Sequence, residues 1–204
     1  MQNKIIIDRK TGVIIPDMAS FIRDVTEKGN IGALLGRLLK VGIGGMLTLA
    51  WWNWKNVLHL AKMEFAYGVL LLTQIEILNL KGHKFDYIIL SDQITDLSVA
   101  LKTKVIIKSA TGTINKIMPK VKVGVMTNNF VRSIEQFYEW GLKLDIIITP
   151  INVSGYEMNP TQKEVEEVIK MNDREKIVAL VNRKGKRDGV YLKKLGIKNS
   201  AYLI

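Results

Sequence analysis

The feature of this sequence that most restricts its fold is the alternation of apolar runs and helical patterns from Asp86 to the last residue. The runs are rich in β-branched residues and lack strict alternation, which is typical of parallel strands buried on both faces. Strands are predicted in six runs: "DYIIL" (86–90), "KVIIK" (104–108), "VKVGVM" (121–126), "DIIIT" (145–149), "KIVALV" (176–181) and "SAYLI" (200–204). Strands that alternate with helices indicate a parallel sheet with right-handed crossovers.

Helical signals occupy several intervals between these runs. Thr161 and Glu164 form a capping box before an apolar helical face, and Asp188 is expected to cap a helix that Gly196 ends. Another helical face combines Val131, Ile134 and Tyr138.

The region before this alternation is less regular. A helix is expected over residues 17–40, with Asp17 at its start and with Gly29 and Gly32 as candidate interruptions. The apolar run "GGMLTLA" (44–50) is predicted to be a strand, and apolar residues at three- and four-residue spacing predict a helical region over 53–80.

These elements predict one α/β domain over residues 1–204. Apolar runs on both sides of "DRKTG" indicate an N-terminal β-hairpin within 1–16, and 86–204 holds the regular β/α alternation. Seven strand candidates follow the hairpin, whereas a TIM-type (β/α) barrel has eight strands. We therefore expect a TIM-type (β/α) barrel that is incomplete, and an open doubly wound parallel sheet is the alternative.

Charge and composition restrict the classes of partner and of site that this chain could have. The chain has 30 Lys and Arg against 19 Asp and Glu, a net charge of +11, which favours anionic partners: phosphorylated metabolites, nucleic acid or anionic lipid. A lysine-rich surface of a thermophilic protein is the other explanation. The absence of cysteine excludes disulfides and thiolate sites, and the two histidines, His59 and His83, have no metal-ligand spacing, so no metal site is expected.

The longest uncharged apolar stretch is Val41–Trp54, which is too short to span a bilayer and is therefore expected to be buried core. No signal peptide is evident, so we expect no membrane span and a cytoplasmic location. The tryptophan cluster Trp51, Trp52 and Trp54 is expected to be core at the end of a strand. The alternatives are peripheral membrane contact and an interface in a homo-oligomer.

Sites on parallel sheets form at the carboxyl ends of the strands. Asp92 follows the first run and Lys108 closes the second, and this pair is the candidate for acid–base catalysis. The candidate substrate-binding residues are Asn128, Asn129 and Asn152. Strand ends also carry polar residues simply because the chain reaches the surface there.

A basic loop follows the run 176–181. Its four cations are Arg183, Lys184, Lys186 and Arg187, and the helix expected to begin at Asp188 lies directly behind them. Helix N-termini attract anions, so these cations are the candidate phosphate-binding residues. A solvated basic loop is the alternative.

The stretch "VGVMTNNFVRSIEQFYEWGLKLDIIITPIN" (123–152) resembles the aldo-keto reductase barrel, and "FAYG" resembles the catalytic "A-x-x-Y-G" of that family. The resemblance implies an NAD(P)-dependent oxidoreductase, with NADP as the cofactor and Tyr67 at the catalytic tyrosine. The family's aspartate is Lys62 here, and its strand-end histidine is absent.

We therefore predict a barrel-type protein that binds an anionic or phosphorylated small molecule or nucleotide. If it is an enzyme, the candidate classes are an NAD(P)-dependent oxidoreductase and a lysine-dependent lyase. The alternatives are a nucleic-acid-binding protein and a degenerate, non-catalytic barrel.

Overall fold

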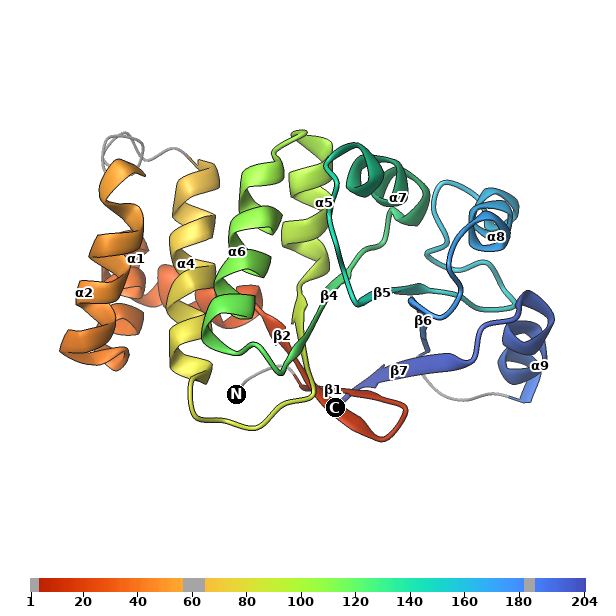
Figure 1. Ribbon diagram of the computed structural model, residues 1–204, viewed down its shortest axis with the longest axis horizontal. Helices are drawn as coiled ribbons and strands as arrows, with labels where there is room; N and C mark the ends of the chain where they lie inside the picture. Colours follow the sequence, from red (N-terminus) through yellow and green to blue (C-terminus); the bar gives the residue numbers. More distant parts are fainter. Residues whose placement is uncertain (1–3, 57–64, 182–185) are drawn as a thin grey trace.

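The computed structural model describes residues 4–56, 65–181 and 186–204, and these residues form a closed α/β barrel (Figure 1). Within the described residues, the strands follow one another around the barrel in chain order: β1 (Lys4–Ile7), β2 (Lys10–Ile15), β3 (Tyr87–Leu90), β4 (Lys122–Met126), β5 (Ile146–Pro150), β6 (Ile177–Leu180) and β7 (Asn199–Leu203). Strands β2 to β7 are parallel, whereas β1 is antiparallel to both of its neighbours.

The N-terminal hairpin closes the barrel. Asp8 and Arg9 form its turn, with φ angles of 46° and 71°. Ile5 of β1 is paired with Gly12 of β2 on one side and with Leu203 of β7 on the other. The predicted hairpin is confirmed, and its first strand takes the place where the first and last parallel strands would otherwise have to meet.

Two predicted strands are wrong. Residues 44–50 lie within helix α2 (Gly42–Asn53), and 104–108 begins helix α6 (Lys104–Ile117). In α6 the buried residues recur at helical spacing and the lysines of "KVIIK" face solvent, so the run is one face of a helix. Because five strands rather than seven follow the hairpin, the barrel has seven strands and mixed direction.

The remaining helices lie outside the strands. They are α1 (Met18–Lys40), the short 3-10 helix η1 (Trp54–Asn56), α4 (Phe65–Leu80), α5 (Asp92–Ala100), α7 (Phe130–Glu139), α8 (Gln162–Met171) and α9 (Lys186–Leu195). Helices α1 and α2 lie at one end of the molecule beside α4 (Figure 1). Asp17 caps α1 by accepting a hydrogen bond from Ser20 N at 3.0 Å, and Gly29, at φ 71°, interrupts that helix. The predicted start of α1 and its interruption at Gly29 are thus confirmed, whereas Gly32 does not interrupt the helix.

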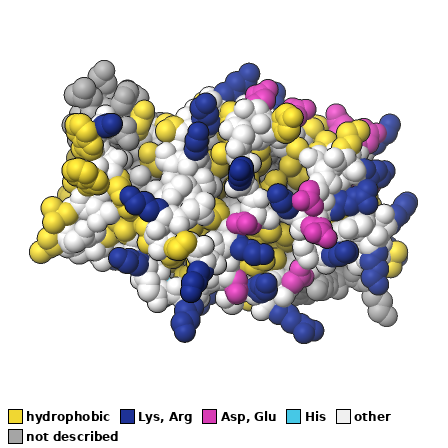
Figure 2. Space-filling view, in the orientation of Figure 1, with side chains coloured by type: hydrophobic (Ala, Val, Ile, Leu, Met, Phe, Trp, Pro, Cys, Tyr) yellow, Lys and Arg dark blue, Asp and Glu magenta, His cyan; other side chains and the backbone are white. Residues whose placement is uncertain are grey.

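Charged and hydrophobic side chains are distributed unevenly over the surface of the molecule (Figure 2). On the face shown, Lys and Arg side chains are spread widely, with Asp and Glu among them over the barrel. Hydrophobic side chains gather at the end of the molecule formed by α1 and α2. Trp51 and Trp54 are exposed, and only Leu49 and Asn53 of α2 are buried, so the prediction that this apolar stretch and its tryptophans are core is wrong. Within the described residues, no single helix is long and apolar enough to cross a membrane; only a sharply bent pair, Ile31–Lys40 with Gly42–Asn53 at 117°, meets the length and composition criteria together.

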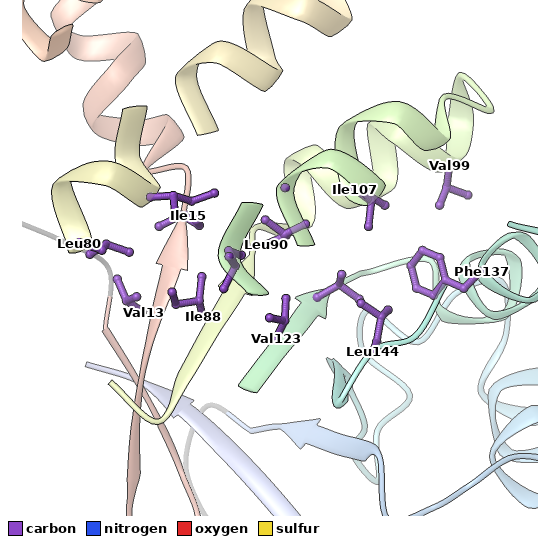
Figure 3. Packing of buried hydrophobic residues seen from close by; sticks show 14 residues of the cluster. Val13, Ile15, Leu80, Ile88, Leu90, Val99, Ile107, Val123, Phe137 and Leu144 are labelled. Atoms are coloured by element: carbon purple, nitrogen blue, oxygen red, sulfur yellow. The ribbon is translucent and has the colours of Figure 1, made fainter. Parts of the chain in front are cut away.

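Two apolar layers lie outside the strands. The first joins β2, β3 and β4 to α4, α6 and α7, and includes Ile15, Ile88, Ile107, Val123 and Phe137 (Figure 3). The second joins β5 and β6 to α7, α8 and α9. Both sheet faces are therefore buried, which explains the continuous apolar runs of the strands.

The inside of the barrel is filled by its own side chains, among them Ile5, Ile14, Ile89 and Ile148. Gly124 also faces inward, where an added Cβ would lie 2.9 Å from the carbonyl oxygen of Ile146. A seven-stranded barrel packed in this way leaves room for a ligand only at its rims.

Candidate functional site

A cavity of about 260 Å³ lies at the rim where β2, β3 and β4 end and β1 begins. Its polar lining comes from Lys4 at the start of β1 and from Ser91, Asp92 and Gln93 at the start of α5. Its apolar floor includes Ile14 and Met126. The cavity therefore joins the barrel interior to a helix N-terminus.

Ser91 is the unusual residue of this cavity. It is only 2% exposed, its N–H donates to the carbonyl oxygen of Ile15 at 2.8 Å, and its own carbonyl accepts from Thr95 N at 2.9 Å. The Oγ atom, however, has no hydrogen-bond partner among the described residues, and it does not cap α5. Burying a hydroxyl without a partner costs about 1–3 kcal/mol.

Asp92 and Asn128 lie together beside this cavity, as the strand order predicted. The Asn128 amide Nδ2 donates to Asp92 Oδ2 at 2.9 Å. The carbonyl oxygen of Asn128 accepts from Asn159 Nδ2 at 3.0 Å. Asn128 is therefore held on both sides, and it fixes one carboxylate oxygen of Asp92.

Sequence reasoning missed Asp96, one turn further along α5. Its carboxylate accepts hydrogen bonds from the hydroxyl of Thr127 and from Asn128 N. Thr127 Oγ1 also lies 2.8 Å from Ser133 Oγ. Burial raises the pKa of Asp96 above its usual range, and the hydrogen bonds from Thr127 and Asn128 partly offset this rise. The i, i+4 spacing from Asp92 was the available signal, because it places both carboxylates on one helix face.

A second cavity, of about 230 Å³, lies beyond the ends of β5 and β6. Asn152 lines it and accepts at Oδ1 from Ser154 Oγ at 2.6 Å and from Tyr156 N at 3.0 Å. The side chains of Glu157 and Asp188 also line this cavity. Two carboxylates make it a poorer place for an anion than the first cavity.

The predicted basic loop is only partly described. Arg183 and Lys184 lie outside the described residues, and Lys186 is the first residue of α9. Arg187 is exposed and lines a shallow apolar hollow. Asp188 lies in the first turn of α9 rather than at its N-cap, and its Oδ1 accepts from Val153 N at 3.0 Å. Phosphate binding by this loop remains a prediction.

Two other predicted site residues have different outcomes. Lys108 is an exposed residue within α6, so the premise that it ends a strand is wrong. Asn129 precedes α7, and its N–H donates to Thr127 Oγ1 at 3.1 Å. Asn129 therefore belongs to the network beside Asp96, whereas Lys108 lies on an outer helix.

The residues that the reductase resemblance implies are not arranged around the barrel mouth. Tyr67 is on α4 and Lys108 is on α6, and both helices belong to the outer layer. The reductase resemblance and the binding of NADP remain predictions, and we derive no step through that cofactor. In the part of the chain that the structure describes, no group of three or more His, Cys, Asp or Glu side chains could hold a metal ion.

Comparisons of the chain with protein-family models, with curated proteins and with solved structures found no match.

Proposed function

We propose that this protein binds a small anionic molecule in the cavity at the barrel mouth. The observation that carries the proposal is Ser91, a residue that lines that cavity and whose buried hydroxyl has no partner among the described residues. A turn of this side chain towards the cavity would expose the hydroxyl to a ligand. A ligand oxygen would supply the missing hydrogen bond. The same mouth carries Lys4 and the N-terminus of α5, both of which favour negative charge.

Asp92 restricts the class of ligand. Its Oδ2 accepts from Asn128, and the carboxylate lines the cavity. A carboxylate repels an anionic group but accepts a hydrogen bond from a hydroxyl. A small molecule with a phosphate or carboxylate at one end and a hydroxyl beside it would satisfy Ser91, Lys4 and Asp92 together. A cavity of about 260 Å³ suits a small metabolite.

Catalysis is a separate question. If the bound molecule reacts, Asp92 is the residue placed to accept its hydroxyl proton, while Asn128 holds the carboxylate in position. Lys108 has no part in this proposal, because it lies on the outer surface of α6. Neither the reductase chemistry nor descent from an eight-stranded TIM-type barrel is needed for binding at this mouth.

Binding of nucleic acid is the alternative that the net charge of +11 suggests. On the face in Figure 2, basic side chains are spread out and have acidic ones among them, rather than forming a continuous stripe. Backbone binding would weaken steeply with salt, whereas capture in a small cavity would not. Filter binding at two salt concentrations separates these functions.

Isothermal titration with inorganic phosphate, glycerol 3-phosphate, malate and NADPH tests the proposal directly. We expect one of the small hydroxylated anions to bind, and Ser91→Ala to weaken its binding about tenfold, because a hydrogen bond to a charged group is lost. The unliganded Ser91→Ala protein should be at least as stable as the wild type, because its unpaired hydroxyl is gone.

Ser154→Ala, in the second cavity, is the matched control and should leave binding unchanged. If no anion binds, or if Ser91→Ala binds as tightly as the wild type, the proposal is wrong.

A further inference from the structure

The α1–α2 end of the molecule exposes large apolar side chains in two regular rows. On the second half of α1 they are Ile31, Leu35 and Leu39, and on α2 they are Ile43, Leu47 and Trp51. Each row has the i, i+4, i+8 spacing of a single helix face. Ile43 is 79% exposed and Trp51 is 75% exposed. We call these six residues, together with the exposed Trp54, the apolar face.

Helix α2 cannot be explained as an ordinary surface helix. Its sequence, "GIGGMLTLAWWN", contains no charged residue, and only Leu49 and Asn53 are buried. A helix that is apolar on all sides is normally covered by protein or by lipid. Contiguous exposed apolar surface of this kind marks an interaction site.

The charges that the segment 31–56 itself contributes to the apolar face are all of one sign. Between Ile31 and Asn56 there are three cations and no Asp or Glu. Arg37 is already neutralised by Glu76 and Asp24, at 2.6 and 3.1 Å. Lys40, at the bend between the helices, and Lys55, after the last tryptophan, are both exposed. Lys40 lines a pocket that also contains Asp24 and Glu76, so its charge is shared with these carboxylates. The segment that carries the face nevertheless brings only positive charge to it.

We propose that the apolar face binds the surface of an anionic lipid bilayer, with α1 and α2 lying in the interface. Leucine, isoleucine and tryptophan would enter the outer acyl region, and Lys40 and Lys55 would extend to anionic headgroups. Trp51 and Trp54 suit the boundary between headgroups and acyl chains, where tryptophan is enriched in membrane proteins. The Lys55 ammonium already lies 5.5 Å from the Trp54 ring centre.

A second copy of the chain fits this face less well than lipid does. A two-fold symmetric interface through this face would place the same cationic segment of both copies in contact. The segment 31–56 offers no carboxylate to pair with its cations. An anionic bilayer supplies both the apolar layer and the negative charge.

Flotation with lipid vesicles tests the proposal on the full chain. We expect the protein to float with vesicles of equal parts phosphatidylcholine and phosphatidylglycerol, and to bind phosphatidylcholine alone at least about tenfold more weakly. Trp51, Trp52 and Trp54 are three of the four tryptophans, so their fluorescence should shift to shorter wavelength on binding.

Two double variants separate the apolar contribution to vesicle binding from the charged contribution. The double variant Ile43→Glu with Leu47→Glu should lose at least about tenfold in binding to mixed vesicles, because two inserted side chains are lost. The double variant Lys40→Gln with Lys55→Gln should lose about tenfold on mixed vesicles and nothing on phosphatidylcholine alone. Met171→Glu, 82% exposed on α8 at the other end of the molecule, is the control and should bind normally.

Circular dichroism of each variant establishes that it is folded. Absence of flotation and of a fluorescence shift with mixed vesicles would overturn the proposal. Sedimentation equilibrium gives the competing answer: a dimer that Ile43→Glu dissociates, without vesicle binding by the wild type, would assign the face to a second copy.

Discussion

Each crossover from β2 onward connects two neighbouring parallel strands, but the first crossover places its helices differently from the later ones. The later ones pack their helices directly on the barrel, and the last occupies only residues 181–198. The first occupies residues 16–86 and carries α1, α2 and α4. Of these three helices, only α4 contributes buried residues to the layer on β2, β3 and β4. Helices α1 and α2 extend that layer sideways (Figure 1).

The two regions therefore differ in what their apolar residues do. In the barrel and its later crossovers, most apolar side chains are buried against other side chains, and they hold the fold together. In α1 and α2, many are exposed and contribute little to folding, so a binding role has to account for them. We call α1 and α2 the arm.

The largest predicted effect is on the barrel interior. Ile89→Ala, at a fully buried position, should lower the free energy of unfolding by about 2–5 kcal/mol, because it leaves a cavity among packed side chains. Leu47→Ala, on the exposed face of the arm, should change it by less than about 0.5 kcal/mol. Urea unfolding measures both, and equal losses would show that the arm is as much a part of the core as the barrel.

The next effect concerns the attachment of the arm. Arg37 of α1 donates to Glu76 of α4 at 2.6 Å, and the other oxygen of Glu76 accepts from Asp17 N at 2.9 Å. Glu76→Gln should cost about 1.5–3 kcal/mol, because a charge-assisted hydrogen bond is lost at a mostly buried site. Glu27→Gln, exposed on the same helix α1, is the control. If both variants unfold at the same urea concentration, the arm is not held by this pair.

A smaller effect on stability should distinguish the barrel from the arm, because the two regions pack differently around their glycines. Gly124→Ala should cost about 1–3 kcal/mol, because the added methyl group would meet Ile89 and Ile146 inside the barrel. Gly36→Ala in α1, with no atom within 4 Å of the added Cβ, should instead stabilise by about 0.5–1 kcal/mol. Thermal unfolding of the two variants should shift in opposite directions, and a shared direction would contradict this account.

The sequence predicted the regular part of the molecule well and the arm poorly. The hairpin and five of the predicted strands are confirmed, because buried parallel strands leave continuous β-branched runs. The runs 44–50 and 104–108 resemble those strand runs in sequence. They are nevertheless helical, because of the surfaces against which they pack. The antiparallel pairing of β1 with β7 joins opposite ends of the chain and leaves no local signal.

The candidate site was likewise predicted only in part. Strand order was sufficient to bring Asp92 and Asn128 to one rim, where they form a hydrogen bond. It could not show that the Ser91 hydroxyl lacks a partner, because that depends on every neighbouring atom. Lys108 was misplaced together with its strand.

The smallest predicted effect compares one carboxylate from each region as the pH changes. Burial raises the pKa of Asp96, beside the barrel, above its ordinary value of 3.8. At Asp24, in the arm, burial also acts to raise the pKa, but Arg37, Lys28 and Lys40 together lower it below 3.8. The two carboxyl groups should therefore give opposite pH dependences of stability.

The sign follows from proton binding in the folded and unfolded states. Folded Asp96 holds its proton more tightly than the unfolded chain, so its contribution to stability is greatest below pH 3.8 and falls as the pH rises towards its folded pKa. Asp24 contributes stability above pH 3.8 that is lost as the pH falls through its folded pKa. Measured against the wild type from acid to neutral pH, the loss of stability in Asp96→Asn should therefore shrink as the pH rises, whereas the loss in Asp24→Asn should grow. Glu135→Gln, an exposed carboxylate on α7, is the reference, and parallel curves for the two Asp variants would show that their surroundings do not differ as the structure indicates.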